Sequence, residues 1–140
     1  MAVHKILVPV DGSTGSMRAL RYAAKRSRGN RNATLMLLNV QLAVPPSALV
    51  PAEVIRDHQS RMAEKVLAPA RGACRRLGIE CRATSLEGEP AEVIASYARR
   101  ARCKEIVMGT RGLGRISSLV LGSVASKVIH LASVPVTLVK

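Results

Sequence analysis

Apolar residues along the chain fall into five short runs. These runs cover residues 5–10, 33–40, 79–86, 105–108 and 134–139. Most are nearly continuous rather than alternating, which is typical of strands that are covered on both faces. The run at 79–86 is more polar than the others and therefore predicts a strand at the edge of a sheet.

Helical periodicity fills the segments between these runs and predicts four helices. The first follows a turn at residues 11–16 that is rich in capping residues, and Gly29-Asn30 ends it. The third begins at Glu89-Pro90, where acidic groups and a proline suit the first turn of a helix. The last contains apolar positions from Leu121 to Ile129.

The second predicted helix contains apolar positions from Ile55 to Leu77 and stops at Gly78. Pro69 lies inside it and lacks the backbone N–H that the helix needs, so we expect a kink or a break near residues 65–69. Three prolines make residues 41–51 the longest irregular connection of the chain.

Strands that alternate with helices require parallel pairing and right-handed crossovers. We therefore expect a three-layer α/β/α sandwich around a five-stranded parallel sheet, built as a single domain over residues 1–140. Such sheets bind ligands beyond the carboxyl ends of their strands, at the point where the strand order switches. In the common orders 2-1-3-4-5 and 3-2-1-4-5, this point lies beside the first strand.

A glycine-rich motif follows the fourth predicted strand. Gly109, Gly112 and Gly122 are separated by two and nine residues, and Ser123 comes directly after the last glycine. Glycine allows backbone N–H groups to approach a phosphate closely, and the start of a helix attracts anions. With Arg111 and Arg115 in the same loop, the spacing favours a phosphate site over a simple turn.

The composition is globular but strongly basic. The 140 residues are 48% hydrophobic, with two Tyr and neither Phe nor Trp, so the core must be aliphatic and base-stacking platforms are close to excluded. Twenty-two Lys and Arg against nine Asp and Glu give a net charge of +13. Charge alone therefore keeps non-specific binding to nucleic acid open as an alternative.

Cysteine usage and the amino terminus bear on localisation. Cys74, Cys81 and Cys103 are odd in number and lack a Cys-x-x-Cys pair, which argues against a disulfide framework or a cysteine zinc site and fits a reducing cytosol. The three histidines share no ligand spacing, so we expect no metal site in the protein itself. We see no signal-peptide pattern and no apolar run of the ~20 residues that a membrane span needs. A cytoplasmic location is expected.

These segments together resemble the universal stress protein family, in its nucleotide-binding form. The resemblance rests on residues 5–13 (Lys-Ile-Leu-Val-Pro-Val-Asp-Gly-Ser), on Gly88-Glu89-Pro90, on the closing segment 135–139 and above all on Gly-x2-Gly-x9-Gly-Ser at 109–123. It implies an adenine nucleotide alpha hydrolase-like fold with strand order 3-2-1-4-5. The sequence departs from the family pattern at Asn39, where many members have a histidine.

The resemblance also implies a ligand, a set of contacts and a partner. The ligand would be ATP, or else ADP or AMP, with Mg²⁺ or Mn²⁺ carried on the phosphates. A homodimer would form through the last strand, residues 134–139. The expected nucleotide-contacting residues are Pro9, Val10, Asp11, Val40, Met108, Gly109, Arg111, Gly112, Gly122, Ser123 and Val124.

The function implied is that of a nucleotide-dependent regulator or sensor in the stress response. Two roles are open for Asp11: it contacts the ligand, or it caps the first helix. The chain lacks the Gly-x4-Gly-Lys-[Ser/Thr] phosphate loop, so we expect no catalytic residues and at most slow ATP hydrolysis. A weak ATPase or phosphotransferase remains the enzymatic alternative.

Overall fold

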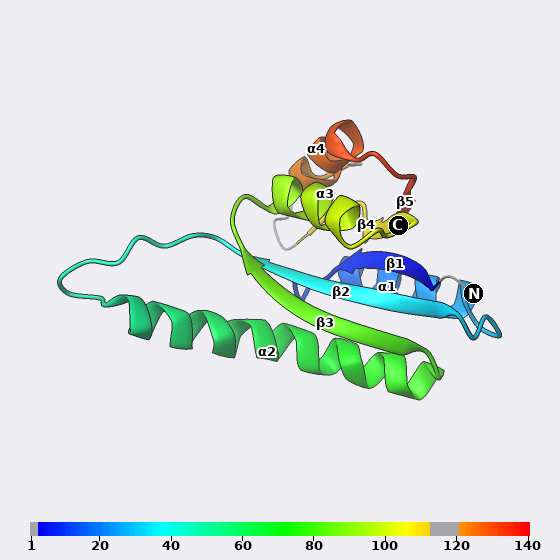
Figure 1. Cartoon of the computed structure of the whole chain (residues 1–140), viewed down its shortest axis with the longest axis horizontal. Coiled ribbons are helices and arrows are strands. Elements are labelled where there is room, and N and C mark those ends of the chain that lie inside the picture. The colour runs from blue at the N-terminus through cyan, green and yellow to red at the C-terminus, as the bar shows by residue number, and fades with distance from the viewer. Residues whose placement is uncertain (1–2, 113–120) are drawn as a thin grey trace.

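The structure is a computed structural model that describes residues 3–112 and 121–140 (Figure 1). The described strands are β1 (His4–Pro9), β2 (Ala33–Gln41), β3 (Glu80–Glu87), β4 (Glu105–Gly109) and β5 (Val136–Val139). The described helices are α1 (Thr14–Arg26), α2 (Ala52–Leu77), α3 (Pro90–Arg100) and α4 (Ser123–Leu131). Strands and helices alternate along the chain, as the hydrophobic pattern predicts.

The strands form a parallel sheet in the order β3-β2-β1-β4-β5. This confirms the predicted α/β class and the order 3-2-1-4-5. β3 is an edge strand, as its polar sequence predicts, and β5 forms the other edge. β1 ends at Pro9, where the missing N–H does not interrupt the pairing of a central strand.

Side chains alternate between the two faces of the sheet and build two cores. Ile6 and Val8 point to the face covered by α1 and α2, where Leu20 of α1 is fully buried. Leu7 points to the opposite face, which α3 and α4 cover with Ile94 and Val128. The large buried side chains are aliphatic, which fits the near absence of aromatic residues.

The expectation that Pro69 breaks the second helix is wrong. α2 runs without interruption from Ala52 to Leu77 and shows no sharp bend in Figure 1. Pro69 and Lys65 both lie on the solvent-exposed side of α2. The Lys65 carbonyl that loses its partner at Pro69 can therefore bond to water, and the helix continues.

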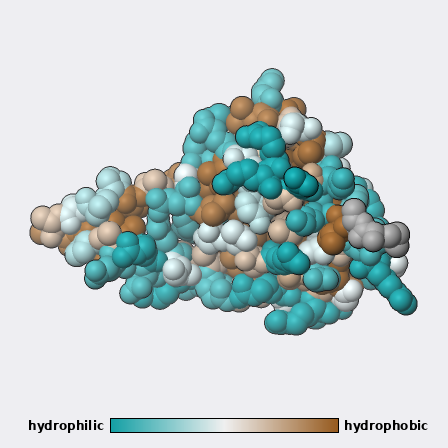
Figure 2. Space-filling model, viewed as in Figure 1, coloured by the Kyte–Doolittle hydropathy of each residue, from teal (hydrophilic) through white to brown (hydrophobic). Residues whose placement is uncertain are grey.

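The first half of α2 and the connection before it extend beyond the sheet (Figure 1). Apolar side chains are exposed on this extension, and Figure 2 shows brown, hydrophobic surface along it. The exposed ones are Leu42, Val44, Leu49, Val50 and Val54. Among the described helices, none has both the length and the apolar character needed to cross a membrane.

Gly72 in α2 offers a simple stability test. A Cβ at this position would come no nearer than 3.4 Å to another heavy atom, the flexible tip of Arg76. Alanine favours a helix interior over glycine by about 0.5–1 kcal/mol, because glycine loses more backbone entropy on folding. We therefore expect Gly72→Ala to raise the free energy of unfolding by about that amount in urea denaturation. A decrease would contradict the assigned helix environment.

Candidate functional site

A cavity of about 360 Å³ opens at the carboxyl ends of β1, β2 and β4, beside the first strand of the sheet. Its volume lies within the range of small-molecule sites. The amino-terminal ends of α1, α3 and α4 complete its wall. The lining residues are Pro9, Val10, Asp11, Ser13, Ser16, Leu38, Val40, Pro90, Ile94, Met108, Gly109, Thr110, Arg111, Gly112, Gly122, Ser123, Val124 and Ala125.

All eleven residues that the sequence predicts at the site line this one cavity, although they come from four separate segments. Sequence reasoning missed seven further lining residues: Ser13, Ser16, Leu38, Pro90, Ile94, Thr110 and Ala125. Strand alternation was a usable signal for Leu38, because it lies two residues before Val40 and shares its face. Pro90 and Ile94 carry no such signal, since it takes the packing of α3 to bring them to the cavity.

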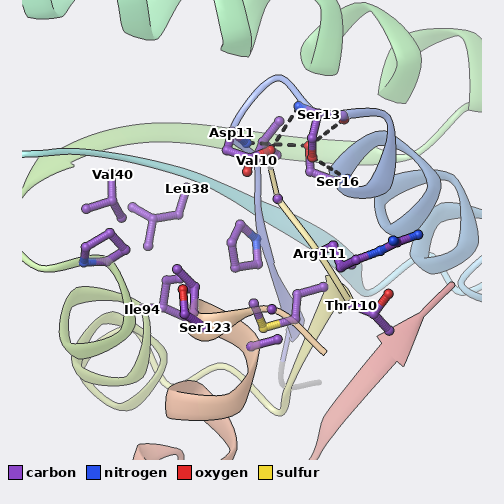
Figure 3. A pocket seen from close by; sticks show the side chains of 18 residues that line it. Val10, Asp11, Ser13, Ser16, Leu38, Val40, Ile94, Thr110, Arg111 and Ser123 are labelled. Carbon is purple, nitrogen blue, oxygen red and sulfur yellow. Dashed lines mark hydrogen bonds between the residues drawn. The ribbon is translucent and has the colours of Figure 1, made fainter. Parts of the chain in front are cut away.

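The cavity has an apolar side and a polar side (Figure 3). Leu38 and Val40 of β2 lie together with Ile94 of α3 on one side. Thr110 and Arg111, from the loop after β4, lie on the other. A ligand that fits both sides would combine an apolar part with a polar or charged part.

Glycines allow close backbone approach around the loop after β4. The Gly122 N–H donates to the Thr110 carbonyl oxygen with an N···O distance of 2.6 Å. A Cβ on Gly122 would lie 3.2 Å from that oxygen, and one on Gly109 would lie 2.9 Å from the backbone carbon of Gly15. Both halves of the glycine motif are thus packed against neighbouring backbone. Residues 113–120, including Arg115, lie outside the described residues.

Asp11 is exposed at the mouth of the cavity and does not cap α1. Ser13 is the N-cap, because its hydroxyl accepts a hydrogen bond from the Ser16 N–H at 3.1 Å. The Asp11 carboxylate instead accepts from the Ser13 N–H at 2.9 Å through Oδ1. A Cβ on Gly112 would lie 2.6 Å from Asp11 Oδ2, so glycine there leaves room for the carboxylate. One carboxylate oxygen therefore faces the loop after β4.

Asn39 stabilises the strands that carry the site, although it does not line the cavity. It is buried, and its Nδ2 donates to the Val10 carbonyl at 2.9 Å. Its Oδ1 accepts from Gln41 Nε2 at 2.6 Å. The first bond ties the segment after β1 to β2, and the second lies within β2. Asparagine thus satisfies buried polar groups at the position where the family resemblance leads one to expect histidine.

The electrostatics of the cavity favour an anion. The amino-terminal ends of three helices reach its wall, and each brings the positive end of a helix dipole. Gly122 is the N-cap of α4 and makes no side-chain capping bond, so the first N–H groups of that helix lack a side-chain acceptor from the cap. Asp11 and Arg111 are the charged residues among the described lining.

The N-cap of α3 introduces a pH dependence next to the site. Glu89 accepts from the Glu92 N–H at 2.8 Å, and this bond lowers the pKa of the Glu89 carboxyl, with Lys127 3.5 Å away adding to the effect. Because the folded pKa lies below the unfolded value, the carboxylate stabilises the fold above the unfolded pKa. That stabilisation is lost as the pH falls through the folded pKa.

We therefore expect Glu89→Gln, which removes this charge, to lower the melting temperature at neutral pH but not in acid. The measurement is the melting temperature of both proteins from about pH 7 down to about pH 3, on either side of the usual Glu pKa. Equal differences at every pH would contradict an ionised N-cap.

The two buried cysteines, Cys74 and Cys103, are not activated as nucleophiles. Burial raises the pKa of Cys74 to about 12, and the adjacent Cys81 adds to the rise. Burial also raises the pKa of Cys103. Both thiols therefore stay protonated at neutral pH. Within residues 3–112 and 121–140, no cluster of three His, Cys, Asp or Glu side chains could hold a metal ion.

Comparison with known sequences gives matches along nearly the whole chain. The Universal stress protein family matches residues 2–140. A universal stress protein of Thermus aquaticus is 37% identical over 138 residues, which cover 96% of this chain and 97% of the relative. The universal stress protein YxiE of Bacillus subtilis is 31% identical over 147 residues, with 98% and 99% covered.

Solved structures share the fold. The universal stress protein of Archaeoglobus fulgidus in complex with dAMP has a TM-score of 0.74 and 28% identity, and all of both chains is covered. A universal stress protein family protein of Arabidopsis thaliana with AMP bound has a TM-score of 0.73 and 26% identity, covering 98% of this chain and 91% of that one. By its sequence and its fold, this chain belongs to the universal stress protein family.

Proposed function

We propose that this protein binds an adenine nucleotide, with ATP as the leading ligand, in the cavity at the carboxyl ends of β1, β2 and β4. The observation that carries the proposal is the convergence of the glycine motif, the β1 carboxyl end and three helix amino termini on one cavity. Relatives of the same family support it, since those from Archaeoglobus fulgidus and Arabidopsis thaliana were solved with dAMP and AMP.

The adenosine part would occupy the side of the cavity formed by β1 and β2. Val40 would border the adenine, and the neighbouring Leu38 offers further apolar surface. Asp11, together with the backbone of Pro9 and Val10, would hold the adenosine from β1. The adenine ring would then lie on the apolar side of the cavity. Removing its apolar surface from water is favourable.

The phosphates would occupy the side formed by the loop after β4 and the start of α4. Gly109 and Gly112 would line the ribose and phosphates, with Met108 beneath them and Arg111 supplying positive charge. The Ser123 hydroxyl and the Val124 N–H would bind phosphate oxygens at the α4 amino terminus, and Gly122, whose N–H donates to the Thr110 carbonyl, would line the phosphates. Glycine at 122 allows the loop after β4 to pack against the start of α4 at the edge of this side of the cavity.

A divalent cation, Mg²⁺ or Mn²⁺, would be carried mainly by the phosphates. Carboxylate oxygens suit both ions, and Asp11 Oδ2 faces the loop that would hold the phosphates. Asp11 is the one carboxylate among the described lining residues, so the described site lacks a second carboxylate to activate water. This favours binding over a dedicated hydrolytic activity.

The bound nucleotide would act as a signal rather than as a substrate. ATP that bridges the segments after β1, β2 and β4 would stabilise one arrangement of those segments over others. The protein would then work as a cytoplasmic stress regulator whose partner surface depends on its nucleotide.

The protein would form a homodimer through β5. β5 pairs with β4 on one side, and among the described strands none pairs with its other side, which is an edge of the sheet. α4, which precedes β5 in the chain, exposes Ile129 and Leu131. A monomeric mass in sedimentation equilibrium would reject this assembly.

The direct test of nucleotide binding is to denature the purified protein, identify any nucleotide released, and measure the melting temperature with added ATP, ADP, AMP and GTP. We expect an adenine nucleotide in the released material, or a melting temperature raised by adenine nucleotides and not by GTP. A ligand at a hundred times its Kd stabilises a protein by about 2.7 kcal/mol. No released nucleotide together with no thermal shift would reject the proposed function.

A further inference from the structure

Ten exposed cations lie at the end of the sheet opposite the cavity. This is the end where β1 begins (Figure 1). All strands of a parallel sheet begin at the same end, and the helices that lead into β2, β3 and β4 finish there. These helices and the loops after them carry the cations. We call the set the basic pole: Lys25, Arg26, Arg28, Arg31, Arg75, Arg76, Arg99, Arg100, Arg102 and Lys104.

Hydrogen bonds hold the loops of the basic pole side by side around the start of β1. The His4 N–H donates to the Asn32 carbonyl at 2.8 Å, which fixes the loop after α1. The Lys104 N–H donates to the Lys5 carbonyl at 2.8 Å, and Lys5 Nζ donates to the Ala101 carbonyl at 3.1 Å, which fixes the loop after α3. The cations of these two loops therefore project from one fixed framework.

Few opposite charges compensate the basic pole. The acidic residues of the same segments are Glu80, beside the start of β2, and Glu105, which forms an ion pair with Arg26. Ten cations against two carboxylates leave a formal charge of +8, the larger part of the net +13 of the chain. The carboxyl-terminal ends of three helices contribute only about −0.5 each.

Helix stability explains only some of these cations. Lys and Arg in the last turn of a helix interact favourably with its dipole, which accounts for residues such as Arg76 and Arg100. Arg28, Arg31 and Lys104 lie in loops beyond the helix ends and repel their cationic neighbours. A cluster of exposed like charges of this kind indicates a surface that binds a polyanion.

We propose that the basic pole binds the phosphate backbone of duplex nucleic acid without sequence specificity. Eight of the ten cations are arginine, whose guanidinium group forms paired hydrogen bonds with phosphate oxygens. The near absence of aromatic residues disfavours single strands, because it leaves few rings for bases to stack on. A membrane surface is also disfavoured, because the apolar face of α1 is buried in the core and cannot insert into lipid.

The test measures the binding of a fluorescent DNA duplex of random sequence at several salt concentrations. The pole variant combines Arg28→Gln, Arg31→Gln, Arg76→Gln and Arg100→Gln. The slope of log K against log salt falls by about 0.9 for each phosphate that the protein no longer neutralises, so we expect it to become shallower by roughly 3 to 4. At low salt we expect the affinity to fall by about tenfold or more.

A matched control removes the same charge from exposed positions outside the basic pole. It combines Arg18→Gln, Arg56→Gln, Arg61→Gln and Lys65→Gln. We expect this variant to keep most of the affinity and the steep slope. Equal losses of affinity in both variants would overturn the proposal, since net charge alone would then drive binding. It would also be overturned by no duplex binding, or by binding of the pole to anionic vesicles in preference to duplex.

Discussion

Replacing Gly122 with glutamate is expected to lower the affinity for ATP by about a hundredfold or more. Gly122 is the N-cap of α4, and a Cβ there would lie 3.2 Å from the Thr110 carbonyl oxygen and 3.3 Å from the Arg111 Cα. The added side chain would press against this loop and bring a negative charge to the side of the cavity proposed for phosphate. Like charges brought together at a binding surface cost several kcal/mol, and each 1.4 kcal/mol is a tenfold change in affinity.

The control for this experiment is Gly72→Glu. It makes the same chemical change on α2, away from the cavity lining, where a Cβ has room. Calorimetric titration of both variants with ATP should show binding close to wild type for Gly72→Glu and almost none for Gly122→Glu. Equal affinity in the two variants would place the nucleotide elsewhere.

Replacing Gly109 with alanine is expected to destabilise the protein by about 1–3 kcal/mol, the usual cost of overpacking a closely packed region. Gly109 is buried at the end of β4, and its added Cβ would lie 2.9 Å from the backbone carbon of Gly15 and 3.0 Å from its carbonyl oxygen. Backbone at the start of a helix cannot move aside as a side chain can. The first turn of α1 and the loop after β4 would have to separate.

Gly72→Ala makes the matched comparison, because it adds the same methyl group where there is room. The two changes should move the free energy of unfolding in opposite directions when measured by urea denaturation. A stabilising Gly109→Ala would show that the contact between α1 and the loop after β4 is not tight.

The fold could be predicted from the sequence because its determinants are local. Apolar runs such as 33–40 mark buried strands, and Gly78 in its left-handed conformation marks the end of α2. The effect of Pro69 could not be predicted in the same way. It depends on whether the helix face at that position meets solvent or the core, which packing decides.

The same distinction applies to the site. The glycine motif and the segment after β1 could be assigned to the cavity from the sequence, because their residue types suit the binding of phosphate and of a nucleoside. Ile94 and Pro90 reach the cavity through the packing of α3 on the sheet, and sequence alone does not signal this. Asp11 and Ser13 are both residue types that cap helices, so the sequence does not decide between them. The backbone geometry makes Ser13 the N-cap.

Binding of an adenine nucleotide at the carboxyl ends of the strands is tested most directly by an NMR titration of the isotopically labelled protein with ATP. We expect the amide shifts to cluster at the segments that line the cavity, after β1, β2 and β4 and at the start of α4. The basic pole lies at the opposite end of the sheet and would attract phosphate by charge alone. Shifts confined to that pole, or no shifts at all, would contradict nucleotide binding in this cavity.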